Sequence, residues 1–189
     1  ENKVDIPDDE LPENADGYVP PPKVAIDDLM AKDAEDESLA RYKETLLSGA
    51  AIPFPDDPRQ VIVEELVVHP DGRDPIVYHP STEDSFSFVL QEGADYTTHL
   101  RFYVQREIVS CLKYQNLVYK GPMRVDKVQT PLGSYAPSLE IIDCVIENGT
   151  APSGFLGRGD YSAKGRLVDD DMNVHLELEY TFKIKKGWE

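Results

Sequence analysis

Metal-binding candidates come first among the side chains of this sequence that could do chemistry. Three consecutive acids, Asp169-Asp170-Asp171, could bind Ca²⁺, but the ligands of a calcium loop alternate with other residues in a D-x-D-x-D-G pattern. The histidines at positions 69, 79, 99 and 175 show no pairing at the spacing of zinc ligands. A solvated turn before a strand is the more ordinary role for the three acids, and we expect no metal site.

Motifs for catalysis or phosphate binding are also missing. The glycine-rich segment 154–159 is neither G-x-G-x-x-G nor a P-loop, and its glycines fit a bulge or a sharp entry into a strand. The sequence contains no G-x-S-x-G nucleophile elbow, and neither Cys111 nor Cys144 lies in a recognisable nucleophile context. The sequence therefore predicts a binding protein without a cofactor rather than an enzyme.

Charge and composition exclude further classes of protein. The 189 residues include 36 acidic and 19 basic side chains, a formal net charge of −17. Such a field repels phosphate backbones, so we expect no nucleic-acid partner. No stretch approaches the roughly 18 consecutive apolar residues of a membrane span, and we expect no stable membrane insertion. We favour two reduced thiols in a cytoplasmic protein, with a single bridge across the fold as the alternative.

The first 58 residues differ in composition from the rest. They hold 16 acidic and 5 basic residues and 8 of the 15 prolines. Low hydrophobicity with high charge cannot bury enough apolar surface to offset chain entropy, so we predict a partly disordered acidic arm over 1–58. Apolar spacing predicts two short helices in this arm, near 25–32 and 36–48. Neither is stable alone at this length, and each needs a partner's surface or the chain's own globular part to pack on.

Residues 59–189 show the period of two that is typical of β-strands. From Val174 to Ile184 every second side chain is apolar, which indicates a half-buried antiparallel strand. Turn residues separate similar runs. Strands are therefore predicted at 61–68, 86–90, 96–104, 115–119, 139–146, 159–168 and 174–184. Short strands in this number, with no long helix, favour an all-β sandwich, which can hold an apolar ligand between its sheets.

Several strings of residues resemble one known family. Residues 35–47 (Glu-Asp-Glu-Ser-Leu-Ala-Arg-Tyr-Lys-Glu-Thr-Leu-Leu) are similar to the second arm helix of the Rho GDP-dissociation inhibitors. Further matches follow in order along the chain, at 18–21, 87–93, 106–110, 133–135, 158–161 and 184–188. The resemblance runs from about Tyr18 to Trp188 with few gaps.

This resemblance implies a fold and a function. The fold is an immunoglobulin-like β-sandwich, which holds the geranylgeranyl tail of a prenylated Rho, Rac or Cdc42-type GTPase between its sheets. The helices of the arm lie on the switch regions of the GTPase, mainly in its GDP-bound form, and block GDP release. Capture of the tail extracts the GTPase from membranes into the cytosol.

The resemblance also assigns roles to individual residues. Asp36 matches the family aspartate that engages the switch region, although a helix cap is its plain structural role. The other matching GTPase contacts are Tyr18, Leu46, Leu47, Asp170 and Asp171. Six positions match the prenyl pocket, with a place in the ordinary core as the alternative for each: Val68, Phe88, Ile108, Tyr119, Leu178 and Tyr180.

The chain departs from the family pattern at three places. Leu178-Glu179-Tyr180 stands where animal members have a Trp-x-Trp pair, which changes the expected shape of the pocket. Gly149-Thr150 replaces an acidic pair that meets the basic tail of the GTPase, and Glu147 is the candidate substitute. Of two kinase-target serines, the first is Ser87 and the second is Asp160, so a phosphorylation switch cannot operate at the second position.

Two other functions stay open at this point. A carrier of other lipidated proteins shares the sandwich but lacks the arm, so the matches in the arm disfavour it. A secreted immunoglobulin-like domain for adhesion or sugar binding would require a disulfide between Cys111 and Cys144. The sequence does not identify the particular GTPase or the trigger of its release.

Overall fold

The computed structural model describes residues 52–188. This part of the chain forms nine β-strands and no helix. The strands are β1 (Val61–Pro70), β2 (Ile76–Tyr78), β3 (Phe86–Gln91), β4 (Asp95–Val104), β5 (Val109–Lys120), β6 (Met123–Tyr135), β7 (Ile142–Thr150), β8 (Gly159–Val168) and β9 (Val174–Lys185). The two helices predicted in the arm lie outside the described residues.

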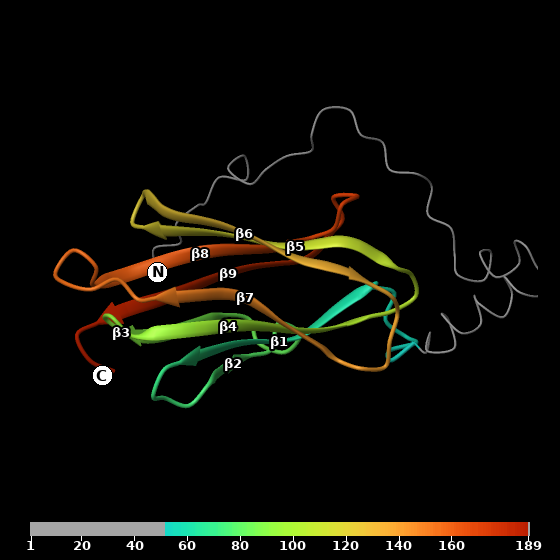
Figure 1. Ribbon diagram of the computed structural model, residues 1–189, viewed down its shortest axis with the longest axis horizontal. Helices are drawn as coiled ribbons and strands as arrows, with labels where there is room; N and C mark the ends of the chain where they lie inside the picture. Colours follow the sequence, from blue (N-terminus) through green and yellow to red (C-terminus); the bar gives the residue numbers. More distant parts are fainter. Residues whose placement is uncertain (1–51, 189) are drawn as a thin grey trace, which may run out of the picture.

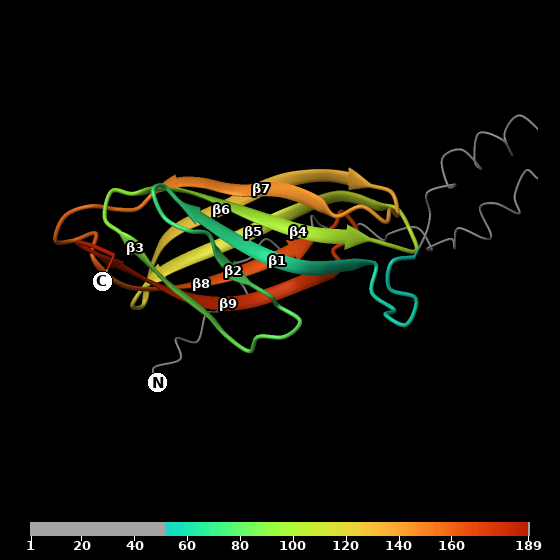
Figure 2. The same cartoon turned by 90° about the horizontal axis from the view of Figure 1, so that it is seen from below.

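The strands form two sheets packed face to face, as the perpendicular views of Figures 1 and 2 show. One sheet has the order β2-β1-β4-β7 and the other the order β3-β9-β8-β5-β6. All pairings are antiparallel except that of β3 with β9. The predicted all-β sandwich is confirmed for this part of the chain.

Alternation of side chains along the strands builds the core between the sheets. On β4, Leu100, Phe102 and Val104 are 0% exposed, as the period of two in this segment predicts. On β9, the apolar face carries Leu178 and Ile184 into the same core. The core is therefore made of every second residue of the long strands, and the remaining side chains face outward.

Two strands, β2 and β6, are absent from the sequence-based prediction. β2 has only three residues. β6 pairs only with β5 and lies at the edge of its sheet, where its mostly exposed side chains follow no apolar alternation. Pro131 and Gly133 also interrupt its sequence, and an edge strand tolerates both residues.

The strand predicted at 139–146 begins only at Ile142, and Leu139 lies exposed in the loop before it.

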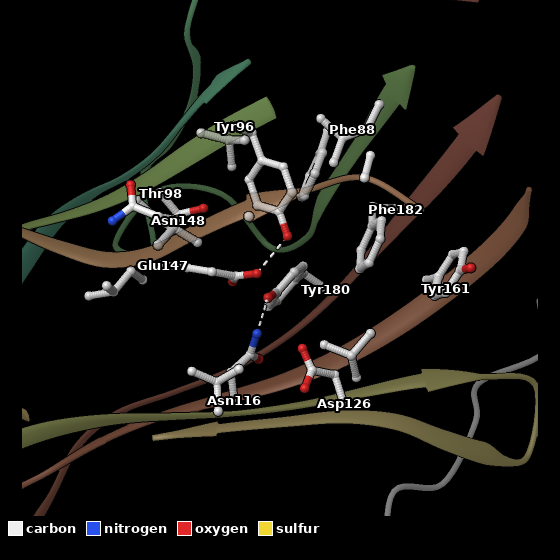
Figure 3. Close-up of a pocket in the computed structure, with 18 of the residues that line it drawn as sticks. Phe88, Tyr96, Thr98, Asn116, Asp126, Glu147, Asn148, Tyr161, Tyr180 and Phe182 are labelled. Atoms are coloured by element: carbon white, nitrogen blue, oxygen red, sulfur yellow. Dashed lines mark hydrogen bonds between the residues drawn. The ribbon is translucent and has the colours of Figure 1, made fainter. Parts of the chain in front are cut away.

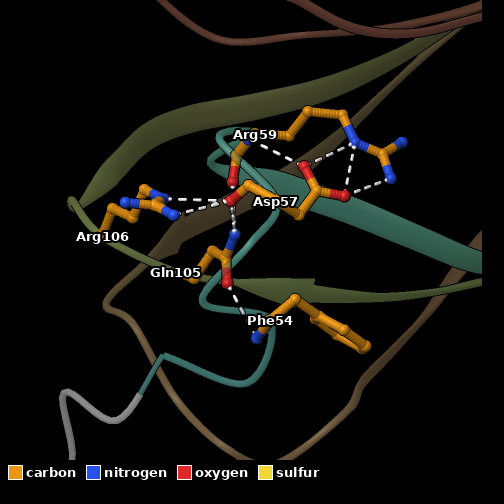
Figure 4. A network of polar contacts seen from close by, with 5 residues as sticks. All are labelled: Phe54, Asp57, Arg59, Gln105 and Arg106. Carbon is orange, nitrogen blue, oxygen red and sulfur yellow. Dashed lines mark hydrogen bonds and ion pairs between the residues drawn. The ribbon is translucent and has the colours of Figure 1, made fainter.

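The segment before β1 is held on the sandwich by the polar network shown in Figure 4. Gln105 is 0% exposed, and its Nε2 donates to the carbonyls of Asp57 at 2.8 Å and Arg59 at 2.7 Å. Its Oε1 accepts a hydrogen bond from the Phe54 amide at 3.1 Å. Hydrogen bonds from Arg59 lower the pKa of the Asp57 carboxyl to about 2. Residues 54–58, assigned to the arm from composition, are therefore attached to the sandwich.

Candidate functional site

A cavity of about 580 Å³ opens between the two sheets. Its walls come from both sheets, and β6 and β7 contribute residues from the two facing edges: Val125, Asp126, Val128 and Thr130 of β6, and Val145 to Thr150 of β7. No backbone ladder joins these two edge strands, and side-chain hydrogen bonds such as that from Thr130 Oγ1 to the Ile146 carbonyl at 2.8 Å link them instead, so the sandwich can part along this line. The cavity has the size of a typical small-molecule site, which is roughly 300–1,000 Å³.

A series of aromatic rings lines one wall of the cavity (Figure 3). Phe88 of β3 stacks on Phe182 of β9 with ring centroids 5.4 Å apart, and Tyr161 of β8 stacks on the same ring at 5.0 Å. The strand register explains this stack, because Phe88 and Tyr161 are the direct neighbours of Phe182 on either side. Aromatic rings at such spacing form a continuous apolar surface suited to a hydrocarbon ligand.

Two hydrogen-bonded pairs add polar groups to this cavity. The Tyr96 hydroxyl donates to Glu147 Oε1 at 2.5 Å, and Asn116 Nδ2 donates to the Tyr180 hydroxyl at 2.8 Å (Figure 3). Asn116 Oδ1 is buried without a hydrogen-bond partner. The second pair bridges β5 and β9, whose backbones are not neighbours in the sheet. These pairs leave the cavity largely apolar but give it polar groups at defined places.

Burial changes the proton affinity of the groups in the cavity. Burial is the main reason that the pKa of Glu147 is raised, and the negative charge of Asp126 raises it further, while the hydrogen bond from Tyr96 lowers it. The pKa of Tyr180 is also raised, mainly by burial and then by the charge of Glu147. Both shifts disfavour charge, so the cavity resists ionisation of its own side chains.

Comparison with known proteins identifies the family. A sequence model of the family described as "RHO protein GDP dissociation inhibitor" matches residues 4–187. The chain belongs to the Rho GDP-dissociation inhibitor family. Its membership confirms the resemblance found in the sequence and makes inhibition of GDP dissociation from Rho proteins the function of the chain.

Relatives in distant organisms match over nearly the whole length. The putative rho GDP-dissociation inhibitor 1 of Dictyostelium discoideum is 39% identical over 186 residues, which cover 93% of each chain. Rho GDP-dissociation inhibitor 1 of Homo sapiens is 37% identical over 186 residues, covering 96% of this chain and 91% of the human protein. Among solved structures, a Niemann-Pick type C2 protein from Japanese carpenter ant aligns with a TM-score of 0.37 at 10% identity, covering 69% of this chain and 96% of that one.

Three of the six positions matched to the prenyl pocket of the Rho GDP-dissociation inhibitors line the cavity: Val68, Phe88 and Tyr180. The other three do not. Ile108 is 58% exposed, because it lies in the loop between β4 and β5. Tyr119 is buried on the other face of β5, since the alternating residues Asn116 and Val118 are the ones that face the cavity.

Leu178 is buried in the core, beyond the stretch of β9 that lines the cavity. The polar residues Asn116 and Glu147 are part of the wall, although neither belongs to the six positions matched to the family pocket. No apolar pattern marks such residues, and only the pairing of the strands brings them to the cavity. Tyr96 and Phe182 lie on strand faces that the alternation identifies as apolar, so the sequence contained a signal for these two side chains.

The turn between β8 and β9 contains the three consecutive acids. Asp169 is buried and accepts hydrogen bonds from the Asn173 amide at 2.8 Å and the Asn173 side chain at 2.7 Å. His175 Nε2 lies 3.0 Å from the same carboxylate. The expectation of a solvated turn is therefore wrong for Asp169, whose carboxylate organises the turn, whereas Asp170 is exposed and Asp171 half-buried. Within residues 52–188, no three acidic, histidine or cysteine side chains gather as a metal site.

Some of the remaining sequence-based predictions concern described residues, and others concern residues of the arm outside the described range. The GTPase contacts expected of Tyr18, Asp36, Leu46 and Leu47 lie outside them. Cys111 and Cys144 are both free thiols, as favoured from the sequence. Asp160, in the place of a kinase-target serine, is exposed and forms an ion pair with Lys183 at 2.8 Å. No helix in the described part of the chain is long and apolar enough to cross a membrane.

Proposed function

We propose that this chain binds prenylated GTPases of the Rho, Rac or Cdc42 type, mainly in their GDP-bound form, in the cytoplasm. The sandwich sequesters the geranylgeranyl tail, and the arm covers the switch regions and blocks GDP release. Removal of the tail from the bilayer extracts the GTPase from the membrane. The observation that carries the proposal is the apolar cavity between the sheets, in a chain of this family.

The energetics of the tail explain why both parts of the chain are needed. A tail of about 20 carbons gains roughly 16 kcal/mol on leaving water, at about 0.8 kcal/mol per buried CH₂. The bilayer offers nearly the same gain, so the transfer from membrane to cavity is close to balanced. Contacts between the two proteins must therefore shift the equilibrium toward the soluble complex.

Charge complements the apolar cavity at its edge. Asp126 and Glu147 face the cavity from the two edge strands, where a polypeptide attached to the lipid would leave it. Rho-type tails are basic, and the formal charge of −17 would speed their encounter with this chain. Glu147 is therefore the candidate for the contact that Gly149 and Thr150 cannot make.

The contacts to the GTPase itself are assigned to the arm and one turn. In the arm they involve Asp36 at the start of the second helix, together with Tyr18, Leu46 and Leu47. Asp170 and Asp171 in the β8–β9 turn form the second contact region. Loss of one partner of a buried charged hydrogen bond at an interface costs about 2–5 kcal/mol, against about 1 kcal/mol for loss of a helix cap. Fluorescent-GDP release measured with Asp36→Ala distinguishes these two roles.

The first test of the proposal is the dependence on the lipid. Affinity for a processed, GDP-loaded Rho-family GTPase should exceed that for the unprocessed form by orders of magnitude, because the cavity supplies most of the buried apolar area. Titration of both forms measures this difference. Equal affinities would contradict a role of the cavity in tail binding.

The second test places a charge in the cavity. Tyr180→Asp should abolish extraction from membranes, since desolvating an unpaired carboxylate costs several kcal/mol or forces it to protonate. Thr181→Asp is the matched control, because the neighbouring side chain is exposed on the opposite face of β9. Extraction that survives in a folded Tyr180→Asp protein would exclude this side chain from the binding site.

A further inference from the structure

The loop between β7 and β8 presents two large apolar side chains to solvent. Phe155 is 87% exposed and Leu156 is 85% exposed, more than any other large apolar residue in the described part of the chain. They are neighbours in sequence, and the β7–β8 loop that carries them projects from one end of the sandwich (Figure 1). Fully exposed aromatic and aliphatic neighbours indicate a surface that contacts something apolar.

Two glycines give this loop its tight shape. Gly154 has a φ of 82°, a left-handed conformation that side chains disfavour. A Cβ on Gly157 would lie 2.7 Å from the Ser153 carbonyl oxygen, so only glycine allows this close approach. The glycine-rich segment that matched no phosphate-binding motif therefore forms a compact turn with Phe155 and Leu156 at its tip.

Backbone groups on both sides of the tip of the loop are hydrogen-bonded within the protein. The Gly154 carbonyl accepts from the amides of Gly157 at 3.0 Å and Arg158 at 3.2 Å. Lys120 Nζ donates to the carbonyls of Leu156 at 2.5 Å and Arg158 at 2.7 Å. Glu92 accepts from the Gly154 amide at 2.8 Å, and the Tyr161 hydroxyl donates to the Gly157 carbonyl at 2.6 Å. Paired backbone groups lower the cost of entering an apolar medium, where unpaired ones are very unfavourable.

Charges around the loop compensate one another, in contrast to the acidic excess of the whole chain. Arg158 forms an ion pair with Glu92 at 2.9 Å, and Asp160 forms one with Lys183 at 2.8 Å. The Lys120 ammonium group lies beneath the loop and adds a positive charge. The tip of the loop is thus apolar, and the charged side chains around it sum to a neutral or positive charge. Such a surface suits the headgroup region of a lipid bilayer better than an acidic surface would.

The loop is continuous with the wall of the cavity. Ala151 and Pro152, which line the cavity, lead directly into it, and Ala151 is fixed by backbone hydrogen bonds to Gly93 at 2.8 Å and Ala94 at 2.9 Å. The turn carrying Asp170 and Asp171 lies at the other end of β8. A surface in contact with Phe155 and Leu156 would therefore adjoin the cavity while leaving that turn accessible.

We propose that the β7–β8 loop inserts Phe155 and Leu156 into the interfacial layer of a lipid bilayer, and so brings the cavity to the membrane. The contact is weak and reversible, because two side chains bury little area. Its role in acquiring the lipid tail rests on the proposed function, whereas the bilayer contact itself does not.

Flotation of the full chain with vesicles of pure phosphatidylcholine tests the contact directly. The double variant Phe155→Ser/Leu156→Ser should lose about tenfold or more of the bound fraction, since burial of these side chains supplies the attraction. Leu139→Ser is the matched control, because Leu139 is a 60% exposed leucine in the loop between β6 and β7. This control should float like the parent, and thermal melting should show all three proteins folded.

Several outcomes would overturn the proposal. The parent could fail to float, the double variant could float like the parent, or Leu139→Ser could lose as much binding as the double variant. Binding that needs phosphatidylserine and persists in the double variant would show a purely electrostatic contact. Sedimentation that shows self-association of the parent, lost in the double variant, would make a second copy the occupant of this surface.

A second measurement separates this proposal from the proposed function. The double variant should extract a prenylated GTPase from vesicles several times more slowly than the parent, while both bind a soluble geranylgeranylated peptide with equal affinity. Failure of the parent to bind the peptide would contradict the proposed function without affecting the flotation result. Equal extraction rates in the two proteins would overturn the role of the loop in tail transfer.

Discussion

Replacing Gln105 with leucine tests how the base of the arm is held on the sandwich. The Gln105 side chain makes three hydrogen bonds, to the amide of Phe54 and to the carbonyls of Asp57 and Arg59, at 2.7–3.1 Å. Each is worth a net contribution of about 1 kcal/mol, so Gln105→Leu should lower the free energy of unfolding by about 3 kcal/mol. Leucine fills a similar volume, and the loss of packing adds little.

Urea unfolding followed by circular dichroism measures this loss. Gln129→Leu is the matched control, because Gln129 lies exposed on the edge strand β6 and accepts a single long hydrogen bond, from Gln115 Nε2 at 3.5 Å, so its substitution should change the free energy of unfolding by less than about 1 kcal/mol. Hydrogen exchange gives a local readout, since the Phe54 amide should lose protection in Gln105→Leu and keep it in the control. A loss below about 1 kcal/mol with the Phe54 amide still protected would refute the reasoning.

The same variant has an expected effect on function. Arg106 still holds the segment through hydrogen bonds to the carbonyls of Pro55 and Asp57, so the base of the arm should loosen rather than detach. Under the proposed function, a loosened arm slows GDP release less effectively, while the affinity for a geranylgeranylated peptide stays unchanged. Fluorescent-GDP release and peptide titration with one protein preparation check both statements.

Three further predictions concern stability. A chain beginning at Ile52 should unfold in urea like the intact chain, whereas one beginning at Arg59 should lose about 2–4 kcal/mol of its free energy of unfolding, because two of the three hydrogen-bond partners of Gln105, at Phe54 and Asp57, and the Phe54 ring packed edge-on to Tyr103 are removed. Burial raises the pKa of Glu147, so just above the ordinary carboxyl pKa the folded protein binds more protons than the unfolded chain, and its stability falls as the pH rises through that window. Thermal melts across pH should show that Glu147→Gln removes this dependence. The variant should also be more stable than the parent at about pH 7. Gly165→Ala should lower the melting temperature markedly, since its Cβ would lie 2.2 Å from the hydroxyl of the fully buried Tyr114.

Strands with a buried and an exposed face could be predicted from the sequence alone. The alternation in β4 and β9 identifies the residues that enter the core, because a period of two in an extended chain leaves only one face for the apolar side chains. The edge strand β6 could not be predicted in this way, since its side chains are mostly exposed on both faces and its pairing with β5 is made by the backbone. Family membership was also readable from the sequence, because its motifs are local strings of residues.

The cavity was decided by the tertiary structure. Ile108 is apolar and matches a pocket position, yet the loop before β5 leaves it exposed, whereas Asn116 is polar and lines the wall. Glu147 likewise meets Tyr96 only because β7 pairs with β4. Alternation tells which side chains point inward, but it does not tell where two sheets separate. That depends on which strands form the edges and how they pack, and it is set by contacts between residues far apart in the sequence.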